Sequence, residues 1–136
     1  MRGGEGSAGS GTFGGRKPVA VARFQIVSVV HQGHNFAWRF LSANNRSMAT
    51  SIGTYSDAGS CLVAVRELQR DLDRSIGVTS QNGSGLWLWR IRLAEADLAV
   101  STRRYHRRVR ARLACQSFLD LAAALAPNAE VQVVHF

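Results

Sequence analysis

The chain has 136 residues, a length typical of one ordinary domain or two very small ones. Hydrophobic residues make up 46% of it and charged residues 19%, which excludes a disordered or low-complexity protein. No apolar run in the sequence approaches the roughly 18 residues of a membrane span. The formal net charge is +8, and every basic residue except Lys17 is arginine, a balance that favours contact with a polyanion.

Residues 1–20 are rich in glycine and show no hydrophobic periodicity, so we predict a flexible tail. They lack the apolar stretch that a secretory signal contains. The run GSGTFGGRK shares glycines with phosphate-binding loops, but it lacks their Lys-Ser/Thr ending and follows no predicted strand. We therefore predict a single folded domain over residues 21–136.

Three predicted strands open this domain. Residues 21–30 are rich in Val, Ile and Phe, which favour strands. Residues 36–41 place three aromatic side chains on one face and Arg39 on the other, because side chains alternate along a strand. A turn with two adjacent asparagines, which accept positive φ at low cost, leads to a third strand within residues 47–55.

A helix and a short strand follow. Ser56 or Asp57 can cap the helix. Apolar residues then recur in one helical stripe, formed by Cys61, Val65, Leu68 and Leu72. The segment SIGVTSQ, residues 75–81, is a predicted strand, and the NGSG after it is a turn.

The rest of the chain repeats this order at an offset of about fifty residues. Residues 87–93, WLWRIRL, match the pattern of FAWRFL, DLAVS aligns with SMATS, and Tyr105 falls on Tyr55. Pro127 ends the second helix, and EVQVVHF is the closing strand. The helical stripe is preserved as Ala111, Cys115, Phe118 and Ala122.

The repeat predicts an α+β domain made of two β3-α-β units, residues 21–82 and 83–136. A unit of roughly 50 residues buries too little surface to be stable alone, whereas two units can share one core. The runs WRFLSANNRSMATS and WRIRLAEADLAVS, each followed by a tyrosine before a helix, resemble the YegP-like tandem-repeat family over about residues 21–136. The resemblance implies a single antiparallel sheet, two helices on one face and terminal strands swapped between the units. It implies no particular activity.

The second copy departs from the first by its charge. The run STRRYHRRVRARL is dense in arginine, whereas the matching GTYSDAGSCLV has none. A helix start attracts anions through its free N–H groups, and guanidinium groups bind phosphate in bidentate fashion. We therefore predict a small basic binding module that contacts nucleic acid or another phosphate-bearing partner, with arginines of the open sheet face extending the site. The candidate residues are Arg103, Arg104, Arg107, Arg108, Arg110, Arg112, Arg90 and Arg92, with Arg39 beside the last two.

Two alternatives stay open. The arginines can form a solvated basic surface or contact an acidic protein. The chain can also be a protein-interaction or self-associating scaffold that uses exposed strand edges and has no nucleic-acid role. Since no aromatic residue shares a face with Arg90 and Arg92, any nucleic-acid contact is expected to be a salt-sensitive backbone contact.

The sequence predicts no catalytic, metal or cofactor site, and therefore a protein that is not an enzyme. His31 and His34 share a turn without a cysteine or carboxylate beside them. Cys61 and Cys115 do not align with each other in the two copies, so we expect reduced core thiols in a cytoplasmic protein. The other notable aromatic residues are expected to be structural, in the core or at strand-to-helix corners: Trp38, Trp87, Trp89, Tyr55 and Tyr105.

Overall fold

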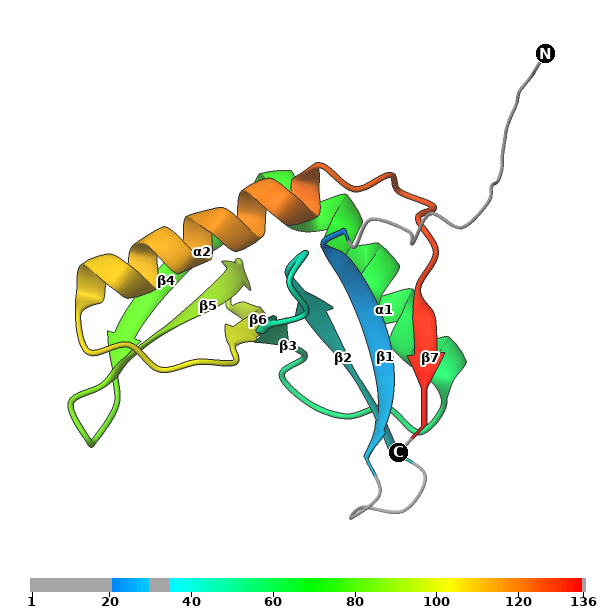
Figure 1. Ribbon diagram of the computed structural model, residues 1–136, viewed down its shortest axis with the longest axis horizontal. Helices are drawn as coiled ribbons and strands as arrows, with labels where there is room; N and C mark the ends of the chain where they lie inside the picture. Colours follow the sequence, from blue (N-terminus) through cyan, green and yellow to red (C-terminus); the bar gives the residue numbers. More distant parts are fainter. Residues whose placement is uncertain (1–20, 30–34, 136) are drawn as a thin grey trace.

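The computed structural model describes residues 21–29 and 35–135. The predicted tail, His31 and His34 lie outside the described residues. Within these ranges the chain forms two α-helices, a short 3-10 helix and a seven-stranded sheet (Figure 1). The helices are α1 Ala58–Asp71, η2 Leu72–Arg74 and α2 Arg108–Ala123. The strands are β1 Arg23–Val29, β2 Asn35–Leu41, β3 Ser47–Thr50, β4 Ile76–Gln81, β5 Trp87–Leu93, β6 Ala96–Ser101 and β7 Gln132–Val134.

The sheet has the strand order β4-β5-β6-β3-β2-β1-β7. Five neighbouring pairs are antiparallel, but β7 runs parallel to β1, with Val133 opposite Ile26. The prediction of a wholly antiparallel sheet is therefore wrong at this edge. The direction follows from where the chain arrives: residues 129–131, after α2, line one hollow together with residues 21–24 at the start of β1. From there β7 joins the edge of the sheet beside β1 and runs in the same direction as β1.

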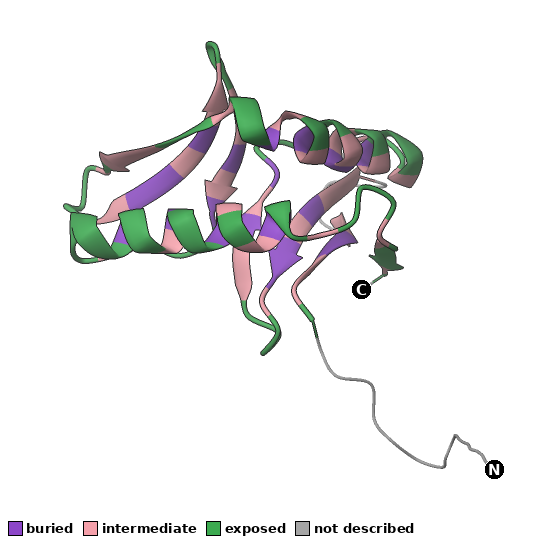
Figure 2. Cartoon of the chain, turned by 90° about the horizontal axis from the view of Figure 1, so that it is seen from above, coloured by how far each residue is buried: buried purple, intermediate pink, exposed green. Residues whose placement is uncertain are grey.

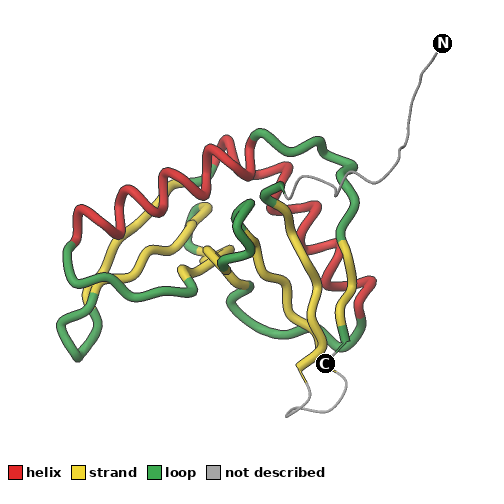
Figure 3. Tube along the Cα trace, viewed as in Figure 1, coloured by secondary structure: helices red, strands yellow, loops and turns green. Residues whose placement is uncertain are grey.

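The connection from α2 to β7 is held by α1. In Figure 3 this loop runs from the end of α2 to the outer strand of the sheet. Arg66 donates from Nη1 to the carbonyl of Pro127 at 3.0 Å and from Nη2 to the carbonyl of Ala129 at 2.8 Å. Gln69 donates to the carbonyl of Ala126 at 3.3 Å. These bonds satisfy loop carbonyls that have no strand partner, and so fix the path to β7.

Side-chain hydrogen bonds also tie β7 to its neighbours on the sheet face opposite the helices, called the open face here. Arg39 of β2 donates from Nε and Nη2 to the side-chain oxygen of Gln25 in β1, at 2.8 and 2.6 Å. Gln25 in turn donates to Gln132 of β7 at 3.0 Å. Gln25 is only 6% exposed, so these partners satisfy a buried amide.

One core joins both helices to one face of the sheet. Phe24 lies opposite Phe40 and Ile26 opposite Trp38, and all four side chains are buried. Both predicted helical stripes are buried against this face, as are Ile91 and Trp89 of β5. Figure 2 shows the buried segments along the middle of the strands and the exposed residues on the outer sides of the helices. The predicted faces of strands and helices are confirmed.

Phe118 of α2 connects the two halves of the core. Its ring stacks on Trp89 with a centroid distance of 5.2 Å. It also meets Phe40 edge-on at 5.1 Å and Phe24 at 6.5 Å. One side chain therefore packs against strands β5, β2 and β1 together. Trp38 and Trp89 are buried as predicted, and Trp87 is half-buried.

The predicted third strand, residues 47–55, is shorter than expected. β3 ends at Thr50, and the next residue, Ser51, still donates from its amide to the carbonyl of Trp38 at 3.0 Å, while its side chain takes the place of its carbonyl as acceptor. Its Oγ accepts from the amide of Trp38 at 3.4 Å and donates to the carbonyl of Gly53 at 2.7 Å. The chain rejoins β2 at Tyr55 through an isolated bridge. The second helix likewise ends at Ala123, before Pro127 is reached.

Candidate anion-binding site at the start of α2

The segment that leads into α2 is anchored to β5 on both sides of its arginine pair. Ser101 accepts from the amide of Trp89 at 3.2 Å and donates from Oγ to the carbonyl of Arg103 at 2.9 Å. Tyr105 and Trp87 then exchange two backbone hydrogen bonds of 2.7 and 2.8 Å. The half-buried Tyr105 packs against the core, as does Tyr55 in the first half. These contacts hold the arginine-rich segment at a defined strand-to-helix corner.

Helix α2 begins without a side-chain cap. Its N-cap residue is Arg107, which makes no capping hydrogen bond, and its first turn contains no acidic residue. Helix α1 differs at this position, because Asp57 accepts from the amide of Ser60 at 2.7 Å. That hydrogen bond is the main reason why the pKa of Asp57 is lowered. The start of α2 thus combines free backbone N–H groups with guanidinium groups.

The predicted arginines are divided by the helix. Arg108 and Arg112 lie on the flank that faces β4. Arg108 donates from Nε to the hydroxyl of Thr79 at 3.2 Å, and its guanidinium carbon lies 5.8 Å from the centre of the Trp87 ring. Arg112 borders a hollow that Thr79 also lines. Both side chains therefore lie against β4, near Thr79.

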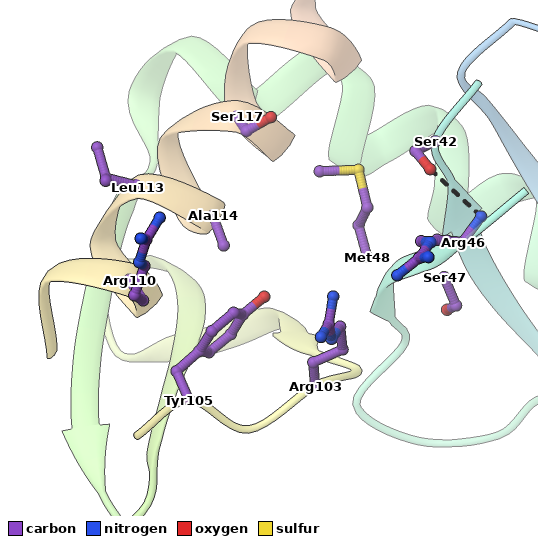
Figure 4. A pocket seen from close by; sticks show the side chains of 10 residues that line it. All are labelled: Ser42, Arg46, Ser47, Met48, Arg103, Tyr105, Arg110, Leu113, Ala114 and Ser117. Atoms are coloured by element: carbon purple, nitrogen blue, oxygen red, sulfur yellow. Dashed lines mark hydrogen bonds between the residues drawn. The ribbon is translucent and has the colours of Figure 1, made fainter. Parts of the chain in front are cut away.

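Arg103 and Arg110 lie on the opposite flank, where they line a pocket of about 530 Å³ between α2 and the start of β3 (Figure 4). A third arginine, Arg46 from the turn before β3, completes the charged lining. In Figure 4, Arg46 and Arg103 point toward the same space, and the hydroxyl of Tyr105 points into it. The remaining lining residues are small or apolar: Ser42, Ser47, Met48, Leu113, Ala114 and Ser117.

Arg46 was not among the predicted site residues. It stands more than fifty positions before Arg103, and its own neighbours, ANNRS, indicate only a turn. The one signal that could have found it is the alignment of the two copies. In each pocket, the tyrosine before the helix of one copy lies near the start of the strand, β3 or β6, that belongs to the other copy. The proximity of Arg46 to Arg103 follows only from the pairing of β3 with β6, in which Ala49 lies opposite Ser101.

The arginines between positions 103 and 112 make no ion pair with any described carboxylate; their contacts are to hydroxyl, carbonyl and ring groups. Some arginines elsewhere do pair with carboxylates. Arg74 lies 2.6 Å and Arg70 3.4 Å from Asp71, and the pKa of Asp71 is lowered chiefly by its hydrogen bond from Arg74. The positive charge at the start of α2 is therefore uncompensated among the described residues.

The structure does not join Arg90 and Arg92 to this cluster. They alternate with core residues along β5 and so point to the open face. Both pair with Asp97, Arg92 at 2.8 Å and Arg90 at 3.6 Å. The hydrogen bond from Arg92 holds the pKa of Asp97 below its usual range. Much of their charge is thus compensated locally.

A second, smaller pocket of about 160 Å³ lies beneath α1. Five of its lining residues correspond to residues of the first pocket at a separation of fifty positions: Tyr55 to Tyr105, Ala64 to Ala114, Leu98 to Met48, Glu67 to Ser117 and Asp97 to Ser47. Its charged residues are Glu67, Asp71 and Asp97. The pKa of Tyr55 is raised, first by burial and then by the nearby Cys61 and Glu67. Two pockets with matching walls therefore differ in their charged residues: arginines line the first and carboxylates the second, where Asp71 and Asp97 also pair with arginines outside the pocket.

The two cysteines lie in the core and form no disulfide. Cys61 and Cys115 are free and buried, as expected of core thiols, and burial raises the pKa of each to about 11. Across the described ranges, no three residues of the types His, Cys, Asp or Glu are arranged to hold a metal ion. None of the described helices is long and apolar enough to cross a membrane.

No known family model matches this sequence, and a search of curated proteins finds no match. Two solved structures share the fold, which is that of the YegP-like proteins. The first is yegP from E. coli, a protein of unknown function, with 13% identity and a TM-score of 0.63 over 88% of this chain and 97% of that one. The second is a UPF0339 protein from Shewanella oneidensis, with 9% identity and a TM-score of 0.65 over 84% and 92%. At these identities the similarity establishes the fold alone.

Proposed function

We propose that this protein is a small basic binding module, without enzymatic activity, that contacts phosphate groups of nucleic acid through the start of α2. The observation that carries the proposal is the uncompensated charge of the arginines between positions 103 and 112. Guanidinium groups around free helix N–H groups suit a phosphate oxygen. Binding rather than catalysis is supported by the pocket, since no carboxylate, histidine or cysteine stands among its described lining residues.

The cellular location belongs to the same proposal. Two buried thiols that remain unpaired support a reducing, cytoplasmic environment, where disulfides are rare.

Fluorescence anisotropy with a labelled oligonucleotide tests the nucleic-acid contact. We expect the Arg107→Gln/Arg110→Gln variant to bind more weakly and to reduce the salt slope, log K against log salt, by about 1–2, since each lost phosphate contact removes about 0.9. The Arg70→Gln/Arg74→Gln variant removes the same charge from the end of α1 and serves as the control. Absence of binding at low salt, or equal losses in both variants, would reject the proposal.

We also infer that the chain is a tandem repeat of two β3-α-β units that exchange their last strands. β4 follows α1 but pairs with β5, while β7 follows α2 but pairs with β1. Isolated bridges recur at the same place in each unit, at Tyr55 and Tyr105. If the exchange is required for folding, residues 21–82 produced alone should be unfolded by circular dichroism, and a cooperatively folded fragment would contradict it.

A second candidate function is self-association through the sheet edges. The two edge strands, β4 and β7, expose Ile76 at 61% and Val133 at 42%. Exposed edges with apolar side chains can pair with another chain. Size-exclusion chromatography with light scattering should then show a dimer that Ile76→Lys or Val133→Lys dissociates. A monomer at all concentrations would rule this candidate out.

A further inference from the structure

The pocket between α2 and β3 has a shape that the rest of the basic surface lacks. It lies at one end of the short β3–β6 contact, where only Ala49–Ser101 and Thr50–Val100 are in register. One wall is the turn before β3, another is the Tyr105 corner, and α2 forms the third. An elongated strand of nucleic acid can follow an exposed helix flank, but a three-walled pocket suits a ligand that ends inside it.

The charge of this pocket is specific to this end of the sheet. Arg46, Arg103 and Arg110 line it, Arg46 and Arg103 pointing into the space and Arg110 lying along its α2 wall (Figure 4), and none makes an ion pair with a described carboxylate. Two like charges directed into one space repel each other, so an anion between Arg46 and Arg103 gains from both, and Arg110 adds positive potential at the wall. The matching pocket beneath α1 carries acidic residues instead. The scaffold alone therefore does not require arginines at this place.

The chemistry of the lining selects among anions. A phosphate monoester carries about 1.5–2 negative charges near neutral pH, more than the single charge of a backbone phosphodiester, and offers three terminal oxygens to guanidinium groups. The Tyr105 hydroxyl can donate to one of these oxygens. The ring of Tyr105 and the side chains of Met48 and Leu113 provide an apolar surface beside the charged group. The volume of about 530 Å³ holds more than a phosphate group.

We propose that this pocket binds a terminal phosphate monoester attached to a planar or apolar group. The proposal rests on the phosphate-binding function proposed above and assigns to the pocket a ligand class that the flank along β4 does not share. A nucleoside monophosphate and the 5′-phosphate end of a nucleic-acid strand both have this chemistry. In either case Arg46 contacts the phosphate together with Arg103.

Isothermal titration calorimetry of the full chain tests the ligand class with adenosine 5′-monophosphate, adenosine and inorganic phosphate. We expect the monophosphate to bind at least about tenfold more tightly than either fragment, and Arg46→Gln to remove about tenfold of that affinity, since a hydrogen bond to a charged group has about this effect. Arg70→Gln, an exposed arginine outside the pocket, should leave the affinity unchanged. Thermal melts of both variants show whether each is folded.

The pH dependence gives an independent readout. Lowering the pH from 7.5 to 5.5 protonates the monoester, whose second pKa is about 6, and should weaken its binding. Binding of an oligonucleotide without a terminal phosphate should not weaken for this reason, because a phosphodiester keeps its single charge over that range. A monophosphate affinity that is insensitive to pH would oppose the proposal.

Two oligonucleotides of one sequence, with a 5′-phosphate and with a 5′-hydroxyl, distinguish the sources of the ligand. Tighter binding of the phosphorylated end, lost in Arg46→Gln, identifies the strand end, whereas equal binding beside a tight monophosphate complex identifies a free nucleotide. The inference is overturned if adenosine and its monophosphate bind equally or if Arg46→Gln changes nothing. Should the oligonucleotides still bind and respond to Arg107→Gln/Arg110→Gln, the general phosphate contact survives; should nothing bind, both proposals fail.

Discussion

At the scale of single residues, the two helix starts predict a stabilising substitution. Asp57 caps α1, whereas Arg107 occupies the N-cap position of α2 with no capping bond. An aspartate at 107 could accept the amide of residue 110 as Asp57 accepts that of Ser60. We expect Arg107→Asp to raise the free energy of unfolding by about 1 kcal/mol, measured by urea denaturation. It should also weaken oligonucleotide binding; a less stable variant would show that the corner has another conformation.

A second residue-scale prediction concerns the contact between β4 and α2. A Cβ atom added at Gly77 would lie 2.5 Å from the sulfur of Cys115, a buried atom that has little room to move. Gly77→Ala should therefore cost about 1–3 kcal/mol of stability by overpacking. The double variant Gly77→Ala/Cys115→Ala removes the sulfur and should recover part of that loss. Additive effects in this cycle would mean that β4 and α2 are not in close contact.

At the scale of elements, the attachment of β7 depends on a side chain of α1. Arg66 holds two carbonyls of the loop that leads to β7, while β7 itself has only three residues paired with β1. We expect Arg66→Ala to increase amide hydrogen exchange in residues 132–134 by about tenfold or more, since hydrogen bonds to charged groups contribute about 1.5–3 kcal/mol. Exchange in β5 should be unchanged.

Arg70→Ala is the matched control, because Arg70 lies on the same helix and, among the described residues, pairs with the neighbouring Asp71. Equal protection of β7 in wild type and Arg66→Ala would mean that the strand is held by the sheet alone, through Gln25 and Gln132 on the open face.

At the scale of the whole molecule, Phe118 makes the two halves one cooperative unit. Its ring contacts Trp89 of β5 and Phe40 of β2, two strands that lie on either side of the short β3–β6 contact in the sheet. Phe118→Ala should cost about 3–5 kcal/mol, as expected for a large aromatic removed from a core. In wild type, unfolding followed by tryptophan fluorescence and by circular dichroism should show one shared transition. Separate transitions in wild type would show that the halves fold independently.

Much of the fold could be predicted because the signals are local. Alternation in FAWRFL and WLWRIRL placed Trp38 and Trp89 in the core, and helical spacing identified both buried stripes. The strand ends were less predictable, since the Ser51 side chain replaces one of the two backbone hydrogen bonds to Trp38, and nothing in SMATSIGTY indicates this. The parallel direction of β7 depends on the path of a loop that Arg66 holds from another helix.

The candidate site was only partly predictable for the same reason. The arginine run itself is written in consecutive residues, so its position at the start of α2 followed from the sequence. Its division into two flanks, the partnership of Arg46 with Arg103, and the pairing of Arg90 and Arg92 with Asp97 did not. Each of these depends on which residues of two segments, distant in the sequence, lie next to each other in the folded chain.

By itself, then, the sequence determined which faces are buried, where α1 begins and where positive charge gathers, because periodicity, capping and charge are properties of neighbouring residues. The tertiary structure alone decided which of those charges are compensated and which enter a common pocket. Pairing β3 with β6 brings residues more than fifty positions apart to the same place. Electrostatic interaction depends on distance in space rather than along the chain.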